Sequence, residues 1–137
     1  MKTSVNWIEN LHLEGETDTG HTVPMDSSPL DMTYGPTPKE LVLQGLAGCT
    51  MMDVISILKK QRKDIEKFFI DVDAELATEH PKVFTKVNIG YNFTSSNLDD
   101  ETARKAIELS REKYCAVYNM LNKAAEITYT LHIKRTE

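Results

Sequence analysis

The stretch from Gly35 to Arg62 decides the fold, and it reads GPTPKELVLQGLAGCTMMDVISILKKQR. It predicts a long helix with a well-marked start. Thr37 can cap the first free backbone amides, and Pro38 falls at the first helical position, where its missing N–H costs nothing. Glu40 follows the cap by three residues, so its side chain can reach back and complete a capping box.

The rest of this helix is almost entirely apolar: Leu41, Val42, Leu43, Leu46, Ala47, Met51, Met52, Val54, Ile55, Ile57 and Leu58. Between Glu40 and Lys59 the only formal charge is Asp53. A helix that is apolar all round is a buried helix. We therefore expect a central helix wrapped by sheet, or one packed against a copy of itself, with Gly45 and Gly48 allowing close approach. The run also reaches the minimum length for a membrane span, but its glycines and its charge make that interpretation the weaker one.

Length and composition indicate one ordinary globular domain, residues 1–137. The net charge is −5, and the basic residues form no single run, which argues against nucleic-acid binding. The N-terminal segment MKTSVNWIENLHLEG lacks the apolar core of a signal peptide, so a cytoplasmic location without a membrane partner is the default expectation.

Hydrophobic alternation and turn signals place the remaining elements. The expected order is three short strands within residues 3–25, a loop at 26–36, the long helix, strands at 69–77 and 83–93, a helix that starts at 95–101, a further helical segment at 114–121, and a strand at 127–133. The two middle strands should form an antiparallel hairpin. The order β-β-β-α-β-β-α-α-β predicts an α+β fold.

Cys49 and Cys115 are the only two cysteines. Free cysteines are commonly buried as small hydrophobic residues, and that remains one interpretation. In a reducing compartment the alternative is a redox-active pair of thiols. The chain has no CxxC motif, and none of its four histidines stands at ligand spacing to a cysteine, so no metal or other cofactor is predicted.

Several segments together carry a family resemblance. They are Gly20-His21-x-Val23-Pro24-Met25-Asp26, Gly35-Pro36-Thr37-Pro38-x-Glu40-Leu41, Leu46-Ala47-Gly48-Cys49-Thr50 with Asp53-Val54, Pro81-x-Val83-Phe84, and Lys113-Tyr114-Cys115-Ala116-Val117. The chain resembles the OsmC/Ohr family of thiol-dependent peroxidases along essentially its whole length.

The resemblance implies an intertwined homodimer in which two central helices pack together inside wrapped sheets. It also implies a peroxide cycle in which Cys49 is the peroxidatic cysteine and Cys115 the resolving one. Glu40 matches the family's active-site glutamate. The expected substrate is an organic hydroperoxide bound in an apolar pocket beside Cys49, and an external thiol is the expected reductant.

Helix geometry limits the role of Glu40. Glu40 and Cys49 are nine positions apart, which puts them on opposite helix faces and about 13 Å apart along the axis. A catalytic Glu40 would therefore have to act on Cys49 of a partner subunit. The alternative is that Glu40 serves the capping box alone, and one residue can fill both roles.

The sequence departs from the family in one respect. Family peroxidases carry an arginine in the N-terminal strand region, whereas this chain has no Lys or Arg between Thr3 and Pro38. A free cysteine is only about 3% thiolate at pH 7, so Cys49 needs help from a cation. His21 is a weak candidate. Arg111, one turn before Cys115, is either a helper of that thiolate or an ordinary surface arginine.

Three functions remain open from the sequence. The first is an OsmC-type peroxidase that uses Cys49 and Cys115. The second is a protein on the same scaffold that binds a small hydrophobic or electrophilic ligand with little turnover, which the missing arginine favours. The third is a reversible Cys49–Cys115 redox switch without catalysis.

Overall fold

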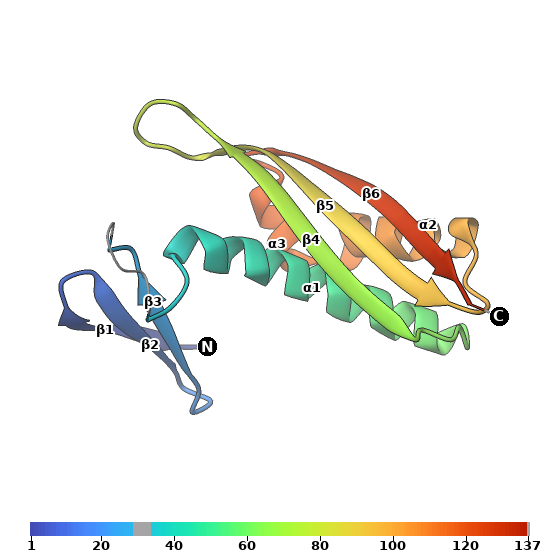
Figure 1. Cartoon of the computed structure of the whole chain (residues 1–137), viewed down its shortest axis with the longest axis horizontal. Helices are drawn as coiled ribbons and strands as arrows, with labels where there is room; N and C mark the ends of the chain where they lie inside the picture. The colour runs from blue at the N-terminus through green and yellow to red at the C-terminus, as the bar shows by residue number, and fades with distance from the viewer. Residues whose placement is uncertain (29–33, 137) are drawn as a thin grey trace. The chain divides into compact units, whose positions relative to one another are not determined.

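The computed structural model of the chain describes residues 1–28 and 34–136. The chain folds into two compact units, Met1–Leu43 and Gln44–Glu137 (Figure 1). The order of helices and strands is the predicted β-β-β-α-β-β-α-α-β, with one short π-helical turn added before the last helix. The α+β class is therefore confirmed.

The first unit carries a three-stranded antiparallel sheet in the order β1-β2-β3. Its strands are β1 (Thr3–Glu9), β2 (His12–Thr17) and β3 (Thr22–Asp26). The turns on either side of β2 each contain a residue of positive φ, Asn10 at 47° and Gly20 at 88°. The predicted loop at 26–36 lies partly outside the described residues.

Helix α1 (Pro38–Lys60) begins as its sequence predicts. The Thr37 N–H donates to Glu40 Oε1 at 2.8 Å, and the Glu40 N–H donates to Thr37 Oγ1 at 3.2 Å. These two reciprocal bonds satisfy two amides that the first helical turn leaves free, which confirms the capping box.

One face of α1 is buried in the single chain. The fully buried residues repeat every four positions, at Leu46, Thr50, Val54 and Leu58. By length and composition alone α1 could cross a membrane, although core helices of soluble proteins pass the same test. In the single chain its burial is that of a helix with one packed face.

The other face of α1 remains uncovered. Met52 is 73% exposed, and a Cβ added at Gly45 or Gly48 would meet no further atom of the described residues within 4 Å. An apolar face of this kind is costly to leave in water.

The second unit is built on a three-stranded sheet in the order β4-β5-β6. The strands are β4 (Lys67–Leu76), β5 (Phe84–Ser95) and β6 (Glu126–Arg135). The first two form the predicted antiparallel hairpin, whereas β6 runs parallel to β5. A parallel neighbour requires a crossover, and it consists of α2 (Asp100–Leu109), the π-helical turn η1 (Ser110–Tyr114) and α3 (Ala116–Leu121).

The core of this unit lies between the sheet and the helices on one side of it (Figure 1). Alternate residues of β5 are buried on this side: Val87, Ile89, Tyr91 and Phe93. The same alternation does not bury the start of the predicted strand, where Val83 is 52% exposed and Thr85 is exposed as well.

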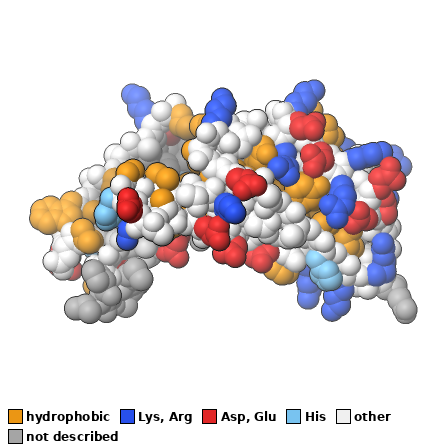
Figure 2. All heavy atoms as spheres, turned by 90° about the horizontal axis from the view of Figure 1, so that it is seen from above, with side chains coloured by type: hydrophobic (Ala, Val, Ile, Leu, Met, Phe, Trp, Pro, Cys, Tyr) orange, Lys and Arg blue, Asp and Glu red, His pale blue; other side chains and the backbone are white. Residues whose placement is uncertain are grey.

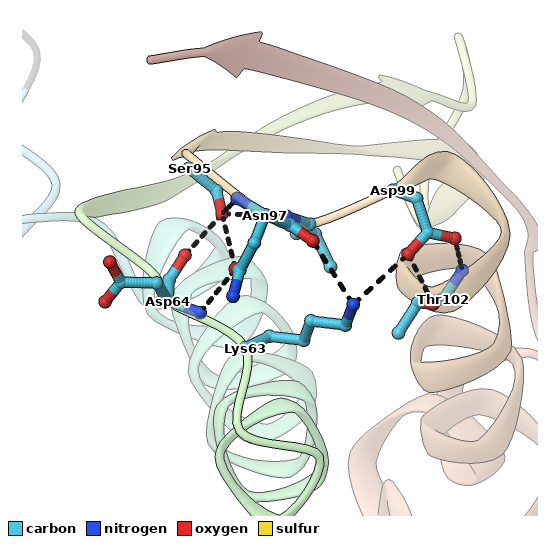
Figure 3. Close-up of polar contacts among 7 residues, drawn as sticks. Lys63, Asp64, Ser95, Asn97, Asp99 and Thr102 are labelled. Atoms are coloured by element: carbon cyan, nitrogen blue, oxygen red, sulfur yellow. Dashed lines mark hydrogen bonds and ion pairs between the residues drawn. The ribbon is translucent and has the colours of Figure 1, made fainter. Parts of the chain in front are cut away.

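A polar network joins the end of α1 to the start of α2 (Figure 3). The Asp64 N–H donates to Asn97 Oδ1 at 2.8 Å, and the Ser95 hydroxyl donates to the Asp64 carbonyl. Asp99 caps α2 by accepting the Thr102 N–H at 3.0 Å and forms an ion pair with Lys63 at 3.5 Å. These bonds fix the position of α2 relative to α1.

Acidic and basic side chains are interspersed on the face that Figure 2 shows. Helix α2 carries two ion pairs between side chains four residues apart, Arg104 with Asp100 and Lys105 with Glu101. Mixed signs of this kind are those of an ordinary solvated surface.

Candidate active site

The two cysteines, 66 positions apart in sequence, meet inside the second unit. The sulfur atoms of Cys49 and Cys115 and a carboxylate oxygen of Asp53 all lie within 4.8 Å of one another. Both cysteines are free thiols. Cys49 and Asp53 are half-buried and Cys115 is fully buried.

Helix α1 supplies two of these three groups. Cys49 and Asp53 are four residues apart, so their side chains lie one above the other on the same helix face. The face next to theirs carries the buried row that begins at Leu46, which anchors the helix against the core. The rigid helix thus fixes the spacing between the thiol and the carboxylate.

The π-helical turn η1 delivers the other thiol. In η1 the Cys115 N–H donates to the Ser110 carbonyl at 2.7 Å, the five-residue spacing of a π turn. Cys115 then leaves the helical conformation with φ −79° and ψ 102° and caps α3. Its sulfur accepts the Tyr118 N–H at 3.3 Å. The sequence predicts a helical segment over 114–121 that includes Cys115, whereas Cys115 is the non-helical residue between η1 and α3.

A chain of hydroxyl groups leads from the sheet to Asp53. Tyr91 and Thr50 are joined at 2.7 Å, and Thr50 and Ser110 at 2.8 Å. Ser110 Oγ donates to Asp53 Oδ2 at 3.0 Å. Because each hydroxyl has one proton, this last bond sets the direction of the others: Tyr91 donates to Thr50, and Thr50 to Ser110. The chain holds the carboxylate of Asp53 beside the two sulfurs.

Burial governs the ionisation of this cluster. It raises the pKa of the Cys115 thiol to about 12, mainly by desolvation, and the nearby Cys49 and Asp53 raise it further. The Tyr118 N–H opposes this effect. Desolvation likewise raises the pKa of Tyr91 to about 12, so its hydroxyl is a neutral donor at physiological pH.

The other residues named from the sequence lie outside this cluster. Glu40 is exposed, and its carboxylate accepts the Thr37 N–H at the start of α1, a bond that lowers its pKa. Arg111 donates to Tyr118 OH at 2.8 Å and to the Ile127 carbonyl at 3.1 Å. Its guanidinium also lies 5.0 Å from the centre of the Tyr118 ring. Arg111 therefore braces β6 and α3 rather than acting as a plain surface residue.

His21 belongs to the turn before β3, where its Nδ1 and Thr19 Oγ1 are 3.1 Å apart. It is exposed, and its contacts in that turn are local.

Sequence reasoning missed Asp53, Thr50, Tyr91 and Ser110 as members of the site. The four-residue spacing of Cys49 and Asp53 was a usable signal, because it places both on one helix face. No such signal exists for Ser110 or Tyr91, which only the tertiary fold brings to α1.

A cavity of about 340 Å³ opens beside the cluster. It is lined by Asp53, Ser56, Ile57, Lys60, Gln61, Leu109 and Tyr114. The surface of the wall is mainly apolar. Its charged groups are the carboxylate of Asp53 and the ammonium group of Lys60, which lies two turns further along α1. Asp53 is the residue that belongs both to the wall of this cavity and to the cluster with the two thiols.

Comparison with known proteins identifies the family of this chain. The sequence profile of the family described as OsmC-like protein matches residues 30–130. The chain belongs to the OsmC-like protein family.

Relatives of this OsmC-like chain match it along nearly its full length. Protein YhfA of Escherichia coli (strain K12) is 38% identical over 133 residues, which is 97% of this chain and 98% of that protein. The solved structure of an OsmC-like protein from Mycoplasma pneumoniae covers 97% of the chain, and 96% of its own length is matched, with a TM-score of 0.85 at 17% identity. The structure of the organic hydroperoxide resistance protein OhrB of Bacillus subtilis has a TM-score of 0.66 at 18% identity, with 96% of this chain and 98% of that chain covered. These structures share the OsmC-like fold.

Proposed function

We propose that the protein is a thiol-dependent peroxidase that reduces organic hydroperoxides through Cys49 and Cys115 in defence against oxidative stress. The observation that carries the proposal is the meeting of the only two thiols of the chain, both free, within 4.8 Å. Membership of the OsmC/Ohr family supports a peroxide-related redox function.

The proposed cycle has three balanced steps. The Cys49 thiolate attacks one oxygen of ROOH, the O–O bond breaks, and Cys49 sulfenic acid and an alcohol result. The Cys115 thiol then attacks the sulfenic sulfur, so that a disulfide forms and water leaves. Two equivalents of an external thiol reduce the disulfide and are themselves oxidised to a disulfide. The external thiol pool of a cytoplasmic location suits this last step.

The short distance between the sulfurs supports the second step. A disulfide requires an S–S distance of about 2.05 Å, so two sulfurs that already lie within 4.8 Å of one another need to approach by less than about 3 Å. The cavity beside Asp53 supports an apolar hydroperoxide, because its wall includes Ile57 and Leu109.

We also propose that the active form is a homodimer in which α1 of each chain buries its uncovered apolar face, as is typical of the OsmC/Ohr family. Met52 and the open glycine positions lie on this uncovered surface. In such a dimer Glu40 would act on Cys49 of the other subunit while keeping its capping bonds. If sedimentation at micromolar concentration shows only a 15.5 kDa species, the homodimer proposal is wrong.

The first experiment follows the thiols directly. The reduced protein receives one equivalent of an organic hydroperoxide, and intact mass and free thiols are measured over time. We expect rapid loss of both thiols, a mass drop of about two hydrogens and a Cys49–Cys115 peptide after digestion. Repeated turnover with a dithiol reductant separates a peroxidase from a redox switch, which is oxidised once and does not consume peroxide further. Thiols that survive for many minutes would overturn the proposal.

A second candidate is a protein that binds a small hydrophobic ligand without turnover. The cavity of about 340 Å³ favours it, as does the lack of any Lys or Arg between Thr3 and Pro38. The test is thermal stabilisation by apolar ligands. Stabilisation that persists in Cys49→Ser, and that is lost in Leu109→Glu because a charge then stands in the cavity wall, would support this function over the first.

A further inference from the structure

We propose that the reduced chain binds one Zn²⁺ ion through Cys49, Asp53 and Cys115. The three side chains bring two sulfur ligands and one carboxylate oxygen to one place, all within 4.8 Å of one another. Sulfur and carboxylate oxygen are both established ligands of zinc.

The spacing of the three atoms fits a tetrahedral ion. Bonds of about 2.3 Å to sulfur and about 2.1 Å to oxygen place tetrahedral ligand atoms about 3.6–3.8 Å apart. The free side chains stand at up to 4.8 Å, so closing on the ion requires a shift of about 1 Å or less. Cys49 and Asp53 lie four residues apart on one helix, the same spacing as paired zinc ligands on a helix in HExxH proteins.

Surrounding groups already orient two of the three ligands. Ser110 Oγ donates to Asp53 Oδ2 at 3.0 Å, and the Tyr118 N–H donates to the Cys115 sulfur at 3.3 Å. Hydrogen bonds of this type fix ligand direction in metal sites. Thr50 in turn holds Ser110 at 2.8 Å, so the orientation extends into the buried core.

Binding of the ion exchanges protons for metal. Zinc takes cysteine as the thiolate, so the ion would displace the protons of Cys49 and Cys115 as it binds. Because Cys49 and Asp53 are only half-buried, the fourth position is open to water.

Oxidation would release the ion. A Cys49–Cys115 disulfide removes both thiolate ligands and leaves a single carboxylate, which holds zinc weakly. Zinc would thus protect the two thiols from oxidation while it is bound, and it would dissociate once they form the disulfide.

The test uses tag-free, reduced, full-length protein and zinc alone. Zinc is titrated in competition with a chromophoric chelator, and Co²⁺ serves as a spectroscopic probe. We expect one equivalent per chain and, with Co²⁺, the thiolate charge-transfer and tetrahedral ligand-field bands. Removing the hydroxyl that orients Asp53, by Ser110→Ala, should lower the affinity about 10–100-fold. Cys49→Ser and Cys115→Ser should each lower it further.

The control is Asp73→Asn, which removes an exposed carboxylate from β4 of the same unit. It should bind zinc like the unmodified chain, whereas Asp53→Asn should bind more weakly. Circular dichroism of each variant verifies that it is folded. Stoichiometric binding that survives Cys49→Ser together with Cys115→Ser, or no competition with the chelator at all, overturns the proposal.

The zinc test contains no peroxide, so its outcome is independent of the peroxidase proposal. If both hold, zinc and hydroperoxide compete for Cys49, a consequence that rests on the function proposed above. Stoichiometric zinc should then slow the loss of thiols by an amount set by its measured affinity, and a chelator should restore the original rate.

Discussion

Thr50 is the residue on which the buried hydroxyl chain depends. It is 1% exposed and bonds both to Tyr91 and to Ser110. Thr50→Val keeps the shape of the side chain but leaves both partners short of a hydrogen bond. We expect the free energy of unfolding to fall by about 1–3 kcal/mol, measured by urea denaturation.

Tyr91→Phe provides the comparison, since it removes only the first donor of the chain. Thr50 can still donate to Ser110 in that variant. Its loss should be smaller than that of Thr50→Val. An equal or larger loss in Tyr91→Phe would contradict the central place of Thr50 in the hydroxyl chain.

The proposed cycle gives the two cysteines different roles, and a single substitution separates them. In Cys115→Ser the Cys49 sulfenic acid has no thiol within 4.8 Å to condense with. It should persist long enough to be trapped by a cyclic diketone and then oxidise further to sulfinic acid. Mass spectrometry after hydroperoxide treatment measures both products.

Cys49→Ser is the matched control for that experiment. It should form no trapped adduct at all, because the remaining Cys115 is fully buried and its pKa is raised to about 12. A trapped adduct on Cys115 in this variant would reverse the assignment of the two roles.

At the scale of the element, α1 presents an open glycine face. Apart from the adjoining backbone of α1 itself, a Cβ at Gly45 meets no atom of the described residues within 4 Å. Gly45→Ala should therefore stabilise the helix of an isolated chain by about 1 kcal/mol, yet weaken a dimer in which that face is packed. Urea denaturation at low concentration and sedimentation across a range of concentrations measure the two effects.

Gln44→Ala is the control on the neighbouring exposed position, where helix propensity hardly changes. Dimerisation that is unchanged in Gly45→Ala would mean that the glycine face is not the interface.

Asp99 at the start of α2 should make the free energy of unfolding depend on pH in the acidic range. Its pKa is lowered to about 2, mainly by the hydrogen bonds from Thr102. A carboxyl with a depressed folded pKa stabilises the fold above its unfolded pKa of 3.8, and that contribution disappears as pH falls towards 2. The difference in unfolding free energy between the unmodified chain and Asp99→Ala should be constant from pH 7 to about 5 and shrink below about 4.

Asp73→Ala, at an exposed strand position, should show no such convergence with the unmodified chain. A difference for Asp99→Ala that stays the same down to pH 2 would contradict the assignment of the shift to the cap.

Elements whose cause is local could be predicted from the sequence. The capping box needs only Thr37 and Glu40, and the buried face of β5 follows from strict alternation. The parallel pairing of β6, the π-helical turn and the bond from Ser110 to Asp53 could not be predicted, because each depends on residues distant in sequence. Helix α1 was therefore predicted correctly from the sequence. That the carboxylate of Asp53 lies beside the two thiols became known only from the folded structure.

At the scale of the whole molecule, residues 1–137 as a single domain remains a prediction. Helix α1 is unbroken across the boundary between the two compact units at residue 43. We expect this continuity to couple their unfolding into one transition. The fluorescence of Trp7, the only tryptophan, reports on the first unit, and helical circular dichroism reports mainly on the second.

Denaturation curves from the two probes should coincide in midpoint and slope. Two separated midpoints would show that residues before α1 unfold independently, and the chain would then be better described as two domains.

The parallel pairing of β5 with β6 has a consequence for how the molecule assembles. Paired residues such as Lys86 and Glu126 are 40 positions apart, whereas the β4–β5 hairpin closes over a short connection. Because distant pairings form late, β6 should join the sheet after the hairpin exists. Cys115 lies in the crossover that β6 closes, so both thiols stay accessible during synthesis and refolding. An oxidant present at that stage would reach both thiols before the fold holds them in place, so the yield of folded protein should depend on reducing conditions during its synthesis.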